Sequence, residues 1–225
     1  LWSIATSRRM WERRAADSDF CQVRVGRGSQ RLETRLVPPQ TGPVEELEPI
    51  TTLALRRFVR AHSLVSDLPI ATSLRGFPAV GMQGDREQCR GLARAILSQL
   101  ATFHTPDDVM IAVASSGRAR TEWDWVKWLP HAQHPTETDG IGQMRLMAGS
   151  LGNIEEMLGE FLVDRPRFQR NAPPPDGQPH IVILLDDAEL TREEQIIIES
   201  GLAGVTLIDL SDTLGALTTK RGMRM

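Results

Sequence analysis

Cysteine is scarce in this sequence: Cys21 and Cys89 are the only two among 225 residues, and no CxxC pair occurs. Two cysteines are too few for a disulfide framework, and the missing spacing removes the commonest signal of a zinc site. No run of about 18 apolar residues is present, and no charged segment followed by an apolar one opens the chain. These absences predict a globular chain in a reducing compartment, without a membrane-spanning helix or a secretory signal.

Groups for acid–base catalysis and for nucleic-acid binding are also few. Tyrosine is absent, there are five histidines, and the net charge is −3 with a pI of about 6.0. Nucleic-acid binders usually carry a basic excess or a basic stripe, so we expect no nucleic-acid partner. Residues 8–14 hold the one local basic excess, with Trp11 inside it, and we interpret it as a solvated helix face.

The N-terminal part of the chain, residues 1–48, is predicted to form a helix followed by a hairpin. Residues 3–14 are typical of a short helix. Apolar and polar residues then alternate over residues 21–25 and 32–36, and residues 26–29, Gly-Arg-Gly-Ser, supply turn chemistry. We therefore interpret this part as an appendage of one helix and one β-hairpin. The charged face of that hairpin would carry Arg24, Arg31, Glu33 and Arg35.

A different pattern begins near Pro49, where apolar runs alternate with helical stripes. Strands are predicted at residues 109–114, 181–185 and 205–210, and the first of these runs is apolar throughout, as in strands that are covered on both faces. Strands that alternate with helices favour a mostly parallel sheet flanked by helices. We therefore expect an α/β domain over residues 49–225. The chain stops soon after a strand, and we interpret the domain as incomplete at its C-terminus.

A strand, a glycine loop and a helix follow one another as in a phosphate-binding loop. Such a loop reads G-x-x-x-x-G-K-[ST]: its backbone N–H groups and lysine hold phosphates, and its hydroxyl holds magnesium. Here Arg86 replaces the second glycine, Glu87 the lysine and Gln88 the hydroxyl. At ~4 Å near a protein surface one charge pair is worth roughly 4 kcal/mol, so an anion at the lysine position opposes triphosphate binding. The degenerate nucleotide loop comprises Gly81, Gly84, Asp85, Arg86, Glu87 and Gln88.

The acidic half of the motif is better preserved. Asp186 and Asp187 follow an apolar strand in the form of a Walker B motif, where one acid would hold Mg²⁺ and the other polarise water. Taken alone, they are equally typical of solvated acids at the end of a buried strand. With the loop upstream, they predict a degenerate RecA-like P-loop NTPase fold in which residues 77–82 and 181–185 are neighbouring strands. We expect no catalytic residue and no cofactor, with ATP and Mg²⁺ as the alternative ligand.

Three segments of the sequence resemble a known family. They are Trp-Asp-Trp-Val-Lys-Trp-Leu-Pro-His at residues 123–131, Ser-Leu-Arg-Gly-Phe at residues 73–77, and residues 100–108. The chain resembles the EccC family, the membrane-anchored FtsK/SpoIIIE-type ATPases of actinobacterial type VII (ESX) secretion systems. The resemblance covers essentially the whole chain and matches the membrane-proximal domain of that family, which is regarded as a degenerate ATPase fold.

The resemblance implies a place at the cytoplasmic face of the inner membrane, with the membrane reached only through a segment absent from this chain. It implies EccB, EccD and EccE as partners, the downstream ATPase domains of the same chain, a homo-oligomer around a pore, and WXG-type and PE/PPE-type substrates. The function that follows is a structural coupling role between the membrane complex and the motor domains in protein export. The alternatives are a nucleotide-binding or weakly active ATPase domain and, third, a DNA translocase domain.

The tryptophans allow two interpretations. Trp125 and Trp128 would share a helix face that excludes Trp123, so both core packing and an exposed contact surface remain open for this group. Trp2 and Trp11 are large apolar groups on a short predicted helix, which needs a docking surface. The partner-contact candidates are Trp2, Trp11, Arg24, Arg31 and Arg35.

Overall fold

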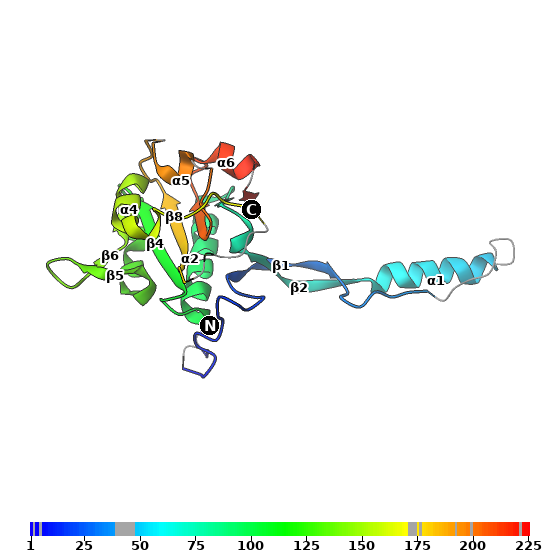
Figure 1. Cartoon of the computed structure of the whole chain (residues 1–225). Coiled ribbons are helices and arrows are strands. Elements are labelled where there is room, and N and C mark those ends of the chain that lie inside the picture. Colours follow the sequence, from blue (N-terminus) through cyan, green and yellow to red (C-terminus); the bar gives the residue numbers. More distant parts are fainter. Residues whose placement is uncertain are drawn as a thin grey trace. The chain divides into compact units, whose positions relative to one another are not determined.

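The structure of this protein is a computed structural model. It describes residues 1, 3–4, 6–38, 48–170, 175, 177–191, 193–198, 200–220 and 222–225 (Figure 1). The chain divides into two compact units, the larger formed by residues 1–23 and 73–225 and the smaller by residues 24–72. The predicted division into residues 1–48 and 49–225 stays a prediction, because compactness alone defines these units.

A parallel sheet forms the centre of the larger unit. Among the described residues it has six strands, and each pair of neighbours is parallel. The predicted α/β fold of the RecA-like NTPase type is thereby confirmed. In order across the sheet the strands are β10 (Met223–Arg224), β3 (Ala79–Gly81), β9 (Val205–Asp209), β8 (His180–Asp186), β4 (Val109–Ser115) and β7 (Met147–Ala148).

One detail of the predicted sheet is wrong. The strands at residues 77–82 and 181–185 correspond to β3 and β8, but they are not neighbours, since β9 lies between them. Asp209 of β9 is paired with Gly81 on one side and with Leu185 on the other. Two strand spacings of about 4.8 Å therefore separate the loop strand from the acidic strand.

The apolar runs form the central strands because both faces of the sheet are covered. All seven residues of β4 and all seven of β8 are buried. Helix α4 (Leu151–Leu158) contributes Ile154 and Leu158 to the core beside them, and helix α2 (Arg86–Phe103) buries an apolar stripe. Short helices α5 (Gln195–Ile198) and α6 (Gly215–Lys220) lie near the top of Figure 1.

The tryptophan-rich segment, residues 123–131, forms no long helix or strand. It runs through helix α3 (Ala119–Trp123) and two 3-10 turns, Asp124–Trp128 and Pro130–Ala132, into a hairpin of β5 (Gln133–Thr138) and β6 (Gln143–Arg145). Trp123 is fully buried, whereas Trp128 is 74% exposed. Core packing therefore holds for Trp123, whereas a contact surface at the exposed Trp128 stays a prediction.

The helix predicted at residues 3–14 is not formed. Successive turns replace it, with Ser7 N donating to Ile4 O at 2.8 Å, and Trp11 has a φ of 58°, which no right-handed helix allows. The N–H groups of Trp11 and Arg13 instead donate to Thr102 O and Phe103 O at the end of α2. This segment therefore satisfies carbonyl groups that a helix end leaves without partners.

The predicted hairpin is also wrong. Strand β1 (Gln22–Arg31) runs straight through the expected turn and pairs with β2 (Leu64–Ser73). The pair is antiparallel, because Leu32 N donates to Ser63 O at one end and Leu74 N donates to Cys21 O at the other. A Cβ on Gly28 would lie 2.6 Å from Ile70 Cδ1, so this glycine permits a close strand contact and makes no turn.

In the smaller unit, helix α1 (Pro49–His62) lies in the sequence between β1 and β2 (Figure 1). Pro49 begins the helix, where a missing N–H costs nothing. None of its residues is buried, and Ile50, Leu53 and Phe58 are each more than half exposed. Along the parts of the chain that are described, no helix has the length and apolarity to cross a bilayer.

Candidate functional site

Both halves of the degenerate motif lie at the carboxyl edge of the sheet, where parallel α/β folds bind ligands. Asp186 ends β8 and is fully buried. Arg86 is the first residue of α2, and its Nη2 lies 2.9 Å from Asp186 Oδ1. The loop therefore lies close to Asp186, as its motif position predicts, although one strand separates β3 from β8.

Two further donors hold the Asp186 carboxylate. Arg90 Nε donates to Oδ2 at 2.7 Å, and the indole Nε1 of Trp123 donates to the same oxygen at 2.9 Å. Burial by itself would raise the pKa of Asp186, but the hydrogen bonds from Arg90, Trp123 and Arg86 outweigh it and lower the pKa below its usual value. Asp186 is thus an ionised carboxylate with both oxygens engaged.

Asp187 has a more open environment. Its side chain is 46% exposed and forms a second ion pair with Arg86 Nη2. Its backbone has a φ of 54°, fixed by the N–H donating to Ser211 Oγ and by the carbonyl accepting from Ser116 Oγ. The hydrogen bonds to Asp186 and Asp187 raise the pKa of Arg86, which keeps the guanidinium between the two acids.

Several backbone N–H groups in and after the loop that leads into α2 donate to the sheet region or to the helix cap. Met82 N donates to Asp209 O at 2.9 Å, and Gln83 N donates to Met225 O at 3.0 Å. Asp85 caps the helix by accepting from Gln88 N at 3.0 Å. Gly84 has a φ of 140°, which only glycine adopts readily. Three backbone N–H groups of this stretch, those of Met82, Gln83 and Gln88, are therefore bonded within the protein.

Glu87, at the lysine position, is paired away from the acids. Its Oε1 accepts from Arg94 Nη1 at 2.7 Å, and Arg94 Nη2 also donates to Glu122 at 2.6 Å. Hydrogen bonding to Glu87 raises the pKa of Arg94. The cation that a nucleotide site places in the loop is therefore replaced by an acidic residue with its own arginine.

Asp186 and the residue at the lysine position do not offer the groups that ATP with Mg²⁺ requires. Magnesium requires a carboxylate oxygen that is free to coordinate it, but both oxygens of Asp186 accept from arginine or indole. Phosphates require backbone N–H groups and a cation in the loop; the N–H groups of Met82, Gln83 and Gln88 donate within the protein, and Glu87 is an anion. Within the described residues, no group of three or more histidine, cysteine, aspartate or glutamate side chains is placed to bind a metal ion.

The partner-contact candidates have different surroundings. Trp2 lies outside the described residues. Trp11 packs on the larger unit itself, with Nε1 donating to Ala101 O at 3.0 Å and its ring edge-on to His131. Arg24 Nε is 3.4 Å from Gly26 O, whereas Arg31 and Arg35 line a groove in the smaller unit.

Sequence reasoning missed two residues of the site. Arg90 follows Arg86 by one helical turn, so the two share a face of α2, and that spacing was the available signal. Trp123 had no such signal, because its indole reaches Asp186 from a distant part of the chain. Together with Arg86, these two residues complete the ring of donors around Asp186.

Comparison with known proteins places the chain among secretion proteins. No protein-family model matches the sequence. The chain is 45% identical over 225 residues to the ESX secretion system protein EccC of Thermomonospora curvata, a match that covers 100% of this chain and 17% of the relative. It is 39% identical over 189 residues to the ESX-4 secretion system protein EccC4 of Mycobacterium tuberculosis, covering 84% of this chain and 14% of the relative.

A third relative agrees. The ESX-5 secretion system protein EccC5 of Mycobacterium marinum is 40% identical over 217 residues, which cover 94% of this chain and 15% of the relative. The chain therefore spans between 14% and 17% of the length of these three relatives.

Proposed function

This chain belongs to the EccC family of ESX secretion systems, and we propose that within such a protein it has a structural role that couples the membrane complex to the downstream ATPase domains. It does so as a catalytically inactive relative of those domains. In this proposal it lies at the cytoplasmic face of the membrane, in a homo-oligomer, and contacts EccB, EccD or EccE during export of WXG-type and PE/PPE-type proteins.

The observation that carries the proposal is the closed set of hydrogen bonds around Asp186. A working site needs this carboxylate for magnesium, yet Arg86 and Arg90 neutralise it and Trp123 donates to the same oxygen as Arg90. A buried carboxylate paired with two arginines supports a fixed conformation of the sheet edge. It supports a fold kept for its surfaces and its position in the assembly.

A nucleotide-binding domain is the second candidate, favoured by the position of Asp186 and Asp187 at the carboxyl edge of a RecA-like sheet. DNA translocation, the third, has no comparable support, since the chain carries a net charge of −3.

The first experiment titrates ATP with Mg²⁺ into the isolated chain by calorimetry and measures phosphate release. We expect neither binding heat nor turnover. Turnover abolished by Asp187→Asn would replace the structural role with the enzymatic one. Duplex DNA titrated under the same conditions tests the translocase alternative.

The second experiment tests coupling in cells that produce the full-length protein. Arg31→Glu with Arg35→Glu should reduce secretion while leaving the melting temperature of the isolated chain nearly unchanged. Arg118→Glu with Arg120→Glu, two exposed arginines of the larger unit, is the matched control. Normal secretion by the first double variant would remove this surface from the coupling role.

A further inference from the structure

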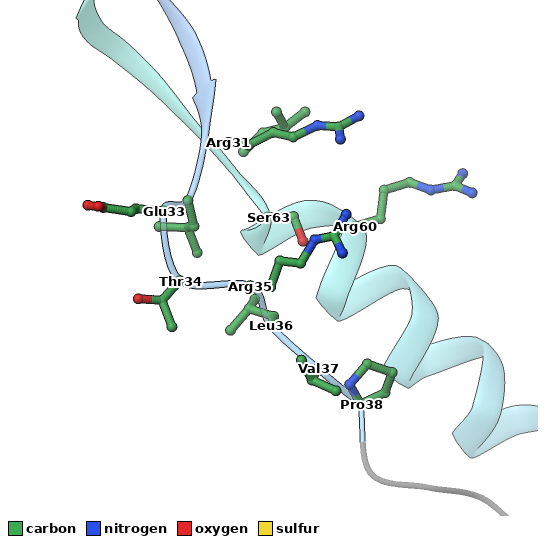
Figure 2. A pocket seen from close by; sticks show the side chains of 11 residues that line it. Arg31, Glu33, Thr34, Arg35, Leu36, Val37, Pro38, Arg60 and Ser63 are labelled. Carbon is green, nitrogen blue, oxygen red and sulfur yellow. The ribbon is translucent and has the colours of Figure 1, made fainter.

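The smaller unit contains an open groove of about 800 Å³. Residues 31–38 form one wall as they leave β1, and the last turn of α1 with the start of β2 forms the other (Figure 2). All of its lining lies within residues 24–72, so the groove belongs to one compact unit.

Three arginines dominate the charge of this groove. Figure 2 shows the side chains of Arg31, Arg35 and Arg60 extending to one side, while Glu33 extends to the other. Among the described residues no ion pair or side-chain hydrogen bond involves these three guanidinium groups, whereas Arg27 in the same unit pairs with Asp67 at 3.1 Å. A chain with a net charge of −3 thus holds a local cluster of cations without acidic partners in its described part.

The wall formed by residues 33–38 also has unused backbone groups. The last backbone hydrogen bond before it is Leu32 N to Ser63 O at 3.1 Å, and in the described part of the chain none follows for residues 33–38. Exposed N–H and C=O groups in a row are what a second extended chain needs in order to add as a strand. A lipid head group has no matching row of donors and acceptors.

Apolar side chains lie among the arginines. Leu36 is 38% exposed, Val37 is 80% exposed and Leu64 is 53% exposed. These positions would receive apolar side chains of a ligand whose carboxylates reach the guanidinium groups, which bind carboxylates in a bidentate manner. The chemistry of the groove is therefore complementary to a segment in which acidic and apolar residues alternate.

We propose that this groove binds an extended, acidic segment of a partner protein, with Arg31, Arg35 and Arg60 pairing with its carboxylates and residues 33–38 pairing with its backbone. The inference deepens the proposed coupling role and rests on it, because it names the chemical class of the segment that docks. The unpaired backbone and the concave shape favour a peptide over a membrane surface.

The test selects random twelve-residue peptides displayed on phage against the immobilised chain. We expect enrichment of aspartate and glutamate alternating with apolar residues. An enriched peptide, labelled with fluorescein, should bind at least 30-fold more weakly to the Arg35→Glu, Arg60→Glu variant. Binding to the matched control Arg118→Glu, Arg120→Glu, two exposed arginines of the larger unit, should stay within twofold. Replacing the acids of the peptide by their amides should weaken binding at least tenfold.

Three outcomes would overturn the inference. They are a selection that enriches no peptide dependent on Arg35 and Arg60, an enriched set without an acidic excess, and binding of mixed phosphatidylcholine and phosphatidylglycerol vesicles that the double variant abolishes while no peptide binds. Failure here leaves the calorimetric result on ATP unchanged. Conversely, ATP turnover would remove the proposed structural role and leave peptide binding intact.

Discussion

Asp186 occupies the position of a Walker B acid at the end of β8, but its partners are all within the protein. Its neighbours are cations and an indole, and its surroundings exclude water. Removing one partner from a buried ionic cluster costs more free energy than the intact cluster contributes to stability, because it leaves a buried charge without a counter-charge.

We expect Asp186→Asn to lower the free energy of unfolding by about 3 kcal/mol, since Arg90 is only 13% exposed and would lose its counter-charge. Asp187→Asn is the matched control: its side chain is 46% exposed, so the loss should stay below about 1 kcal/mol. Urea unfolding of both variants measures the difference. Equal, small losses would mean that the ring of donors contributes little to stability.

His180 carries a second residue-scale prediction, on pH. It is buried at the start of β8, with Nε2 3.1 Å from Thr206 Oγ1. Burial, with Arg165 nearby, lowers its pKa to about 3, whereas an unfolded histidine has a pKa of about 6.5. Below about pH 6.5 the unfolded chain therefore binds a proton at His180 that the folded chain does not bind. The contribution of His180 to the free energy of unfolding is complete above about pH 6.5 and falls as the pH decreases toward 3.

Between pH 7 and pH 5 this one group should remove about 2 kcal/mol from the free energy of unfolding. The measurement is urea unfolding of the parent chain and of His180→Gln at both pH values. The variant should lose less stability than the parent over this interval, by the amount that His180 contributes. The buried His104 and His131 are present in both chains, so their contributions cancel in the comparison. An identical pH dependence would contradict the assignment.

At the scale of elements, the connection from β3 to α2 decides whether the nucleotide site can be rebuilt. Restoring the motif by Arg86→Gly, Glu87→Lys and Gln88→Ser leaves Met82 N and Gln83 N bonded to the sheet, and Arg90 bonded to Asp186. We therefore expect no measurable gain in affinity for ATP with Mg²⁺ by calorimetry. Adding Arg90→Ala to the triple variant removes one donor from Asp186. It thereby tests whether the geometry of the loop or the occupied carboxylate prevents binding. Micromolar binding by the triple variant alone would show that the loop still folds around phosphates.

The elements also show what the sequence could and could not predict. The fully buried strands β4 and β8 were predictable, because their apolar runs are long and continuous. The hairpin at residues 20–36 was mispredicted because glycine has two uses, and Gly28 permits contact with Ile70 where a turn was expected. The helix at residues 3–14 failed because tertiary bonds to the end of α2 override local propensity.

The candidate site was half predictable for a similar reason. Arg86, Asp186 and Asp187 were identified by motif position, which is local in sequence. The partners that close the site depend on pairings between distant segments: Asp186 and Arg90 are 96 positions apart, and Asp186 and Trp123 are 63 apart. The insertion of β9 between β3 and β8 likewise leaves no mark in any single window of sequence.

Across the whole molecule, stability is expected to be uneven. Every residue of β8 is buried, whereas α1 has fourteen residues and none is buried. Helices of that length without packing are marginal in water. In hydrogen–deuterium exchange of the isolated chain, amides of α1 should exchange within minutes and those of β8 only on global unfolding. Comparable protection in both elements would show that α1 is held by contacts beyond those described.

The place of β3 in the sheet also determines how long this strand waits for its partner during translation. Gly81 is paired with Asp209, so more than half of the chain must be translated between the two partners. At roughly 5–20 residues per second, β3 waits on the order of 6–26 s before its partner in β9 exists. For that time its unpaired backbone edge is exposed to chaperones and to nascent chains nearby. The insertion of β9 between β3 and β8 therefore makes the central sheet one of the last parts of the domain to be completed.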